Sequence, residues 1–188
     1  MILPKWWPHR WYNDKSTSVM ITDISEHIPE DFSGGSRIWI YQASRTFFMS
    51  EALDMEPMLQ AFVQSWNSHG SPVKGYANLF FGRFIIIMAD ESRVQVGGCS
   101  TDSSVRLVKA IESKYKVDMF DRQMLAFIVK DKIEVIPLSQ LPYALQRGFI
   151  TEETLYFDNT VSNKEELLSR WITPLKQSWL SRYLVPQT

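Results

Sequence analysis

One run of six apolar residues, Phe84-Ile85-Ile86-Ile87-Met88-Ala89, constrains the fold of this chain more than any other feature. The run is far shorter than the ~20 residues of a membrane-spanning helix, but it has the length of a β-strand. A strand that is apolar on both faces is typical of the centre of a sheet that is covered on both sides. Residues 74–80 precede the run and Gly82 lies in the short link, so the two segments predict a β-hairpin.

Propensity and periodicity predict the remaining elements. The expected strands are residues 37–42, 74–80, 83–89, 124–129, 132–136 and 155–157. The expected helices are residues 54–68, 100–115, 138–147, 164–171 and 174–184. We expect Asp54 to cap the first of these helices and Gly70 to end it.

This order of elements predicts an α+β fold. We expect a largely antiparallel sheet with helices packed on one face, followed by C-terminal helices. The first six elements have the order of a ferredoxin-like fold. Seven apolar residues are predicted to share one core: Trp39, Phe62, Trp66, Phe84, Ile86, Val108 and Ile111. Because side chains alternate along a strand, the opposite side of the strand at 37–42 is expected to stay partly open.

The first 19 residues differ from the rest of the chain. Trp6, Trp7 and Trp11 lie among prolines and basic residues without helical or alternating periodicity. We expect these residues to form a poorly ordered extension. The alternative is an arm that binds a membrane surface or a partner. Met20 is an alternative natural start of the chain. Residues 20–188 are expected to form a single α+β domain.

Composition excludes several classes of function. The net charge of −1 offers no basic face for nucleic acid. Cys99 is the only cysteine of the 188 residues, so an intrachain disulfide and a cluster of thiolate ligands are excluded. No apolar segment is long enough for a membrane span. No motif predicts a metal site or a cofactor site. A single cysteine fits a reducing compartment, so a cytoplasmic location is expected.

Cys99 lies in an unusual position for a reactive side chain. It follows two glycines and directly precedes the expected helix at 100–115. A helix N-terminus favours the thiolate, whereas burial disfavours it. In a cysteine-dependent enzyme or thiol sensor, His69 is the candidate base and Asp102 a third candidate residue. We expect burial of the thiol to outweigh the helix dipole and leave Cys99 unreactive.

The start of the same helix is also a candidate anion site. Ser100, Thr101, Ser103 and Arg106 bring hydroxyls and a positive charge to helix N–H groups. The alternative is a polar cluster that only caps the helix. Elsewhere, carboxylates at strand ends, such as Asp121, and arginines, such as Arg122, either pair with one another or form an anion site.

Several short sequence words occur together in an order that resembles a known family. They are Arg37-Ile38-Trp39-Ile40-Tyr41-Gln42-Ala43, Trp66 with His69-Gly70, Arg83-Phe84, Asp90-Glu91-Ser92, Gly98-Cys99-Ser100-Thr101-Asp102-Ser103-Ser104, Phe120-Asp121-Arg122, Trp171 with Pro174-Leu175, and Ser178-Trp179. Over residues 20–184 the chain resembles a family of small uncharacterised bacterial proteins, some of which carry the label "ABC transporter ATPase". The resemblance implies no activity. The chain also lacks the Gly-x-x-x-x-Gly-Lys-Ser/Thr segment of a P-loop, so ATP hydrolysis of that type is not expected.

The sequence therefore predicts a non-enzymatic module that binds a protein partner or a small ligand. The alternative is a cysteine-dependent enzyme or thiol sensor centred on Cys99. The position of the Cys99 sulfur separates the two hypotheses.

Overall fold

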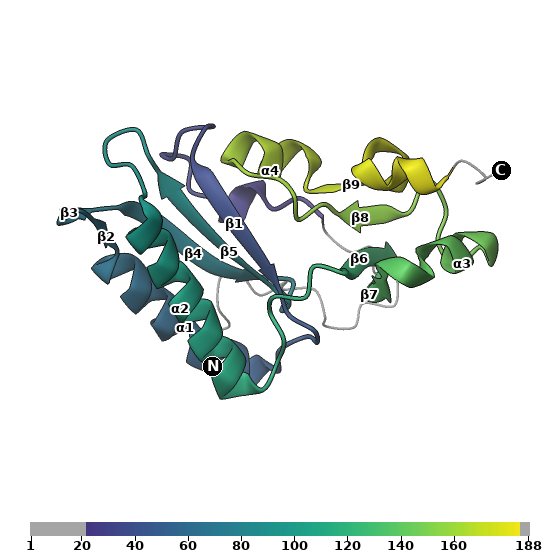
Figure 1. Cartoon of the computed structure of the whole chain (residues 1–188), viewed down its shortest axis with the longest axis horizontal. Helices are drawn as coiled ribbons and strands as arrows, with labels where there is room; N and C mark the ends of the chain where they lie inside the picture. Colours follow the sequence, from purple (N-terminus) through teal and green to yellow (C-terminus); the bar gives the residue numbers. More distant parts are fainter. Residues whose placement is uncertain (1–21, 185–188) are drawn as a thin grey trace.

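A computed structural model of the chain describes residues 22–184, which form an α+β fold with three antiparallel sheets (Figure 1). The first sheet has the order β1-β5-β4, with β1 (Arg37–Gln42), β5 (Phe84–Asp90) and β4 (Lys74–Phe80). The second main sheet has the order β7-β6-β8-β9, with β7 (Lys132–Pro137), β6 (Met124–Val129), β8 (Leu155–Phe157) and β9 (Ile172–Pro174). A two-stranded hairpin pairs β2 (Asn67–Ser68) with β3 (Ser71–Pro72).

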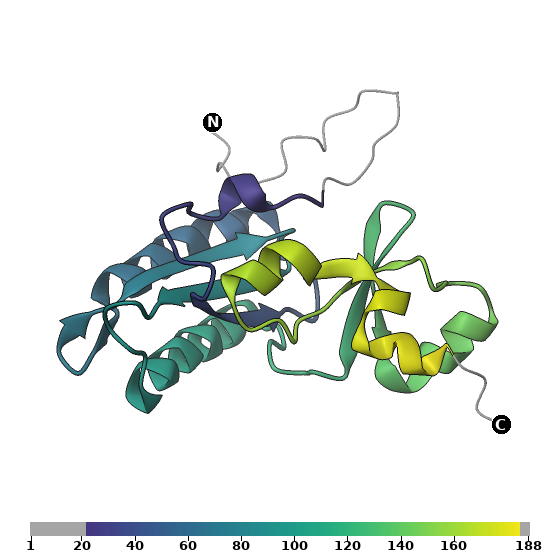
Figure 2. The same cartoon turned by 90° about the horizontal axis from the view of Figure 1, so that it is seen from above.

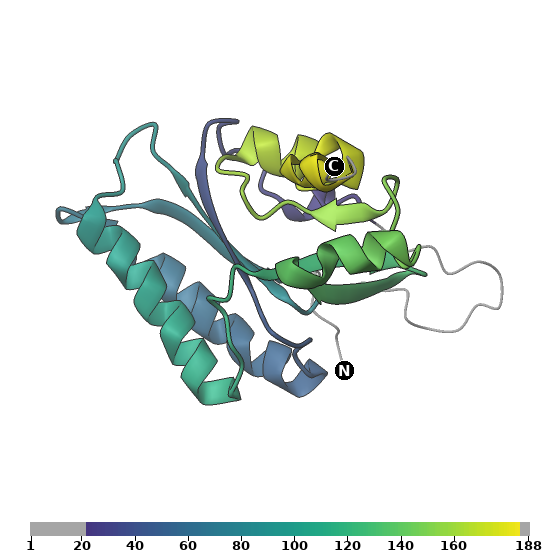
Figure 3. The same ribbon diagram turned by 45° about the vertical axis from the view of Figure 1, so that its right-hand side comes forward.

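Helices cover both faces of the first sheet. The α-helices are α1 (Met49–Ser65), α2 (Gly98–Tyr115), α3 (Leu141–Gln146) and α4 (Lys164–Arg170). The 3-10 helices are η1 (Ser25–His27), η2 (Leu138–Gln140), η3 (Leu175–Gln177) and η4 (Trp179–Tyr183). Helices α1 and α2 lie together on one face of the first sheet, and α4 lies over the other face (Figure 3). The second main sheet continues the molecule along its long axis (Figure 2).

Strand β5 is the doubly covered central strand that its apolar run predicts, and all seven of its residues are buried. Ile85, Ile87 and Ala89 pack against the helix layer of α1 and α2. Phe84, Ile86 and Met88 point to the other face, where they meet the layer that contains Trp171. The prediction of one common core is therefore wrong, because the alternation of side chains along β5 divides the apolar residues between two cores.

Strand β1 is divided in the same way. Trp39 and Tyr41 pack on the side of α1 and α2, whereas Ile38 and Ile40 pack in the second core. Residues after β8 cover Ile38 and leave it only 4% exposed, whereas Ile40 is half-buried, so this second side is covered at Ile38 and partly open at Ile40.

Three strands of the first sheet, β1, β5 and β4, have the antiparallel order that a ferredoxin-like sheet requires. In such a sheet the strand after the second helix lies beside β1. Here that strand is β6, which pairs with β7 and β8 instead. The first sheet thus ends at β1, and the place of a fourth strand is not filled by β6.

Three expected helices differ from the structure, and the one at 138–147 is the 3-10 helix η2 followed by α3. Helix α1 begins at Met49, so Asp54 is not its cap; the Glu51 carboxylate accepts the Phe48 N–H at 2.8 Å and starts the helix earlier. It ends at Ser65, because the chain then turns into the β2–β3 hairpin.

The expected helix at 174–184 is not continuous. Thr173 pairs with Tyr156 in the sheet, and Ser178 has an extended backbone that separates η3 from η4. The predicted hairpin at 124–136 is confirmed, and Lys130 and Asp131 both have the positive φ of a tight turn. The expectation for residues 1–19 lies outside the described residues.

Candidate functional site

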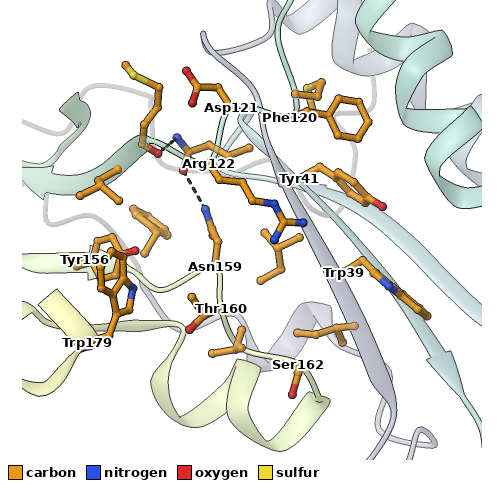
Figure 4. Close-up of a pocket in the computed structure, with 18 residues that line it drawn as sticks. Trp39, Tyr41, Phe120, Asp121, Arg122, Tyr156, Asn159, Thr160, Ser162 and Trp179 are labelled. Carbon is orange, nitrogen blue, oxygen red and sulfur yellow. Dashed lines mark hydrogen bonds between the residues drawn. The ribbon is translucent and has the colours of Figure 1, made fainter. Parts of the chain in front are cut away.

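A cavity of about 370 Å³ lies along the outer edge of β1, between the first and second main sheets (Figure 4). Five consecutive residues of β1, at positions 38–42, line it, together with residues from segments 119–125 and 156–162 and Trp179. Neighbouring side chains of a strand point to opposite faces of the sheet. A cavity that contacts five consecutive residues must therefore lie along the edge of the strand, where it meets the backbone. Its size falls within the range of small-molecule sites.

The edge of β1 is open because a neighbouring segment leaves it. The Ile38 N–H donates to Ser162 O at 3.0 Å, which begins a strand-like pairing. The Ser162 N–H does not return a bond to Ile38 and donates instead to Glu166 Oε2 at 2.8 Å. Before this point the chain turns around Asp158, whose Oδ1 accepts the Thr160 N–H at 3.1 Å. The turn carries the backbone away from β1 and leaves room for the cavity.

Ile40 presents its backbone to this cavity. In an antiparallel ladder, the N–H and C=O of one residue point to the same side and the side alternates along the strand. Ile38 bonds outward to Ser162, whereas Ala43 bonds inward, with its N–H to Arg83 O at 2.9 Å. The N–H and C=O of Ile40 therefore point outward. Within residues 22–184, strand β1 has a partner strand only on its β5 side.

A chain of side-chain hydrogen bonds forms the polar wall of the cavity and joins the two sheets. Trp171 Nε1 donates to Asn159 Oδ1 at 3.0 Å, and Asn159 Nδ2 donates to Gln42 Oε1 at 2.9 Å. Gln42 Nε2 then donates to Met124 O at 3.0 Å, at the start of β6. These bonds connect the end of β1 with the end of β8 and the start of β6.

Trp179 and Tyr156 lie together at one end of the cavity (Figure 4). The indole Nε1 of Trp179 is buried, and within the described part of the chain no acceptor satisfies it. Burial raises the pKa of Tyr156, and the nearby Trp179 indole opposes that rise in part. The Tyr156 hydroxyl is therefore the polar group near this N–H, and the surrounding side chains cover the Nε1 atom.

Arg122 extends from the segment before β6 toward β1, between Tyr41 and Asn159 (Figure 4). No carboxylate among residues 22–184 forms an ion pair with it. Burial raises the pKa of Tyr41, and the Ser104 hydroxyl and the positive charge of Arg122 partly offset the rise. Asp121 also lines the cavity, but its Oδ1 accepts the Gln123 N–H at 2.8 Å.

The predicted cysteine site is only partly assembled. The side chain of Cys99 is exposed, so the expectation that its thiol is buried is wrong. The backbone turns at Gly97 and starts α2 one residue before Cys99, which keeps the side chain at the surface. His69 lies against Gly97, with its Nε2 3.2 Å from the place of a Cβ there. Within the described residues, no hydrogen bond joins Cys99, His69 or the exposed Asp102.

The expected helix at 54–68 would place His69 at a helix C-terminus, but the structure places it elsewhere. It has a φ of 51° in the turn of the β2–β3 hairpin rather than a place at the end of α1. Its ring therefore contacts the start of α2, not the C-terminus of a helix.

The hydroxyls of the predicted anion site are used by the helix and its neighbour. Ser100 Oγ donates to Asn67 O at 3.0 Å, and Thr101 Oγ1 donates to Gly97 O at 3.2 Å. Ser103 Oγ donates to Ser100 O at 2.6 Å, and the Arg106 side chain is exposed further along α2. These hydroxyls donate to carbonyl oxygens and do not accept from helix N–H groups. Because Gly97 is the N-cap of α2 and no side chain caps the helix, the capping alternative is wrong as well.

The cavity residues were not found as a set from the sequence. Arg122 and Asp121 were candidates only as members of general groups of charges. Gln42, Asn159 and Trp179 carry no local motif, because they meet only when the two sheets pack. The one available signal was the group of sequence words that contains Gln42, Arg122 and Trp179.

Comparisons with models of protein families, with curated proteins and with solved structures find no match for this chain. The family resemblance in the sequence therefore stays a prediction. Within residues 22–184, no helix has the length and apolar character that crossing a membrane requires. The same residues contain no group of three or more His, Cys, Asp or Glu side chains placed to hold a metal ion.

Proposed function

We propose that this protein is a non-enzymatic binding module whose small ligand occupies the cavity at the edge of β1. The observation that carries the proposal is the cavity of about 370 Å³ at the open edge of β1, whose lining includes the polar side chains of Gln42, Asn159 and Arg122.

The remainder of the wall supports the same function. Apolar side chains such as Ile38 and Val161 alternate with polar groups such as Gln42, Asn159 and Arg122. This mixture of apolar lining and a few directed polar groups is typical of small-molecule sites. The hydrogen bonds from Trp171 through Asn159 and Gln42 hold the wall in place before a ligand arrives, which reduces the entropy lost on binding.

A fragment screen by ¹H–¹⁵N NMR tests the proposal, because indole N–H resonances are separate from backbone amides. Binding fragments are expected to shift the Trp179 indole resonance and leave that of Trp66 unchanged. Trp66 is the internal control, since its Nε1 already donates to Ser100 O at 3.0 Å on the helix side of the first sheet. The variant Trp179→Phe assigns the resonance.

The proposal is wrong if fragments that bind the protein leave the Trp179 resonance in place and perturb another surface. The cysteine-dependent alternative receives less support. Cys99 is exposed, as a reactive thiol must be, but no base or carboxylate among the described residues is hydrogen-bonded to it.

A further inference from the structure

We infer that the ligand is the C-terminal end of an extended peptide, which pairs with Ile40 on the edge of β1 and places its carboxylate near Arg122. The inference rests on the proposed function, because it uses the same cavity. It adds the chemical class of the ligand and the backbone groups that recognise it.

The first argument is the form of the edge. Ile40 directs one N–H and one C=O into the cavity, and no segment of residues 22–184 pairs with them. One residue of an extended peptide matches this pair of groups with its own C=O and N–H, as in an antiparallel ladder. Addition of a strand to an open sheet edge is a common mode of peptide recognition. It would fill the place beside β1 that β6 does not take.

The second argument is that the open edge is short. At one end, the Ile38 N–H is bonded to Ser162 O and Arg37 forms a bridge with Asn163. At the other end, the Gln42 side chain bonds to the Met124 carbonyl. A peptide that continued in both directions would meet one of these segments. The cavity therefore suits a chain end, and its volume of about 370 Å³ limits the bound part to a short segment.

The third argument is the excess of hydrogen-bond donors. The exposed Arg122 side chain forms no ion pair with a carboxylate of the described residues. The amide groups of Gln42 and Asn159 each have a second N–H beyond the one that they use in the wall. The acidic residue of the lining, Asp121, lies at the rim beside Arg122 (Figure 4). Such a set of groups favours a carboxylate over an ammonium group, hence a C-terminus over an N-terminus.

The test measures amide hydrogen exchange and NMR shifts of the full chain with N-acetyl-L-alanyl-L-alanine as the probe. A ligand of this size is expected to bind with a Kd on the order of 1 mM. The Ile40 amide should exchange quickly in the free protein and at least about tenfold more slowly when the peptide is saturating. The amides of Trp39 and Tyr41 face β5 and are internal controls, which should be protected in both states.

Variants of the ligand and of the protein separate the two contacts. The C-terminal amide of the same peptide should bind about 3–10-fold more weakly, because it lacks the charge that Arg122 attracts. N-methylation of the amide that pairs with Ile40 should weaken binding about tenfold or more. Arg122→Gln should remove the preference for the acid over the amide, whereas Arg122→Lys should keep part of it. Arg93→Gln makes the same change in net charge at an exposed residue outside the cavity and should have no effect.

Three results would overturn the inference. In the first, the acid and the amide of the peptide bind equally well. In the second, the Ile40 amide stays unprotected from exchange while the peptide is bound. In the third, the Ile40 amide is already protected in the free chain and loses that protection when residues 185–188 or 1–21 are deleted, which would make the occupant part of this chain. If fragments shift the Trp179 resonance but the peptide does not bind, the proposed function holds and only the peptide is wrong.

Discussion

Replacement of Asn159 by alanine tests whether the hydrogen-bonded wall joins the two sheets. The variant removes the acceptor of the Trp171 indole N–H and the donor to Gln42 Oε1. Trp171 is completely buried, so water does not reach its Nε1 and the unpaired donor costs about 1–3 kcal/mol. Gln42 is 9% exposed and borders the cavity, where water can replace part of its lost bond. We expect the free energy of unfolding to fall by about 2–4 kcal/mol in total.

This loss corresponds to a fall of about 5–15 °C in Tm for a domain of this size. Urea unfolding followed by tryptophan fluorescence, together with calorimetry, measures both quantities. Asn67→Ala is the matched control, because Asn67 is exposed and its Nδ2 bonds only to Ser65 O; it should cost less than about 0.5 kcal/mol.

A double-mutant cycle with Trp171→Phe gives the result that would refute the reasoning. If the Trp171 N–H is orphaned in Asn159→Ala, its removal by phenylalanine should cost at least about 1 kcal/mol less in that background than in the wild type. Additive effects, or a cost of Asn159→Ala below about 1 kcal/mol, would show that the bond between Trp171 and Asn159 does not stabilise the wall.

Four further predictions follow from other parts of the fold. Gly75→Ala places a Cβ 2.7 Å from the Trp66 ring and should destabilise the protein by about 1–3 kcal/mol. Trp66→Ala should lower the free energy of unfolding by about 3–5 kcal/mol, because only 3% of this residue is exposed. Denaturant unfolding measures both changes. Cys99 is exposed, so folded protein should react with iodoacetamide at a rate on the order of that of the unfolded chain. Hydrogen bonds from the Ser92 hydroxyl and backbone amides hold the pKa of Asp90 below its ordinary value. Its stabilisation is therefore complete above pH ~4 and is lost as the pH falls through the lower pKa of the folded state, so Asp90→Asn should flatten the decrease in stability at acidic pH.

Each of these predictions has a control or a contradicting result. Gly35→Ala meets no atom within 4 Å and should leave the unfolding midpoint nearly unchanged. Alkylation of Cys99 that begins only on unfolding would show that the thiol is covered. An acid-unfolding curve that is the same for Asp90→Asn and the wild type would show that Asp90 does not contribute through its ionisation.

Much of the fold could be predicted from the sequence because its signals are local. The apolar run of β5, the β-branched and aromatic residues of β1, and the turn at Gly82 predict the first sheet directly. Helix boundaries were less predictable, since the bond from Phe48 to Glu51 starts α1 earlier than the expected cap at Asp54.

The partition of the core required the tertiary structure. Periodicity shows that β5 is covered on both faces, but it does not show that a second layer containing Trp171 covers the side of Phe84 and Ile86. The exposure of Cys99 was also decided by tertiary structure, because a helix start favours the thiolate and a buried site disfavours it, and only the path of the backbone selects between them.

The cavity at β1 depends on the same difference between local and long-range information. The sequence determined that residues 37–42 form a strand, because that preference lies in the residues themselves. It did not determine the partner of that strand, since pairing is chosen by the packing of segments far apart in the chain. Gln42 and Asn159 are 117 positions apart and become neighbours only because β6 joins β8 rather than β1. Strand-forming preference is a local property of the chain, whereas an open strand edge is a property of the assembled sheets.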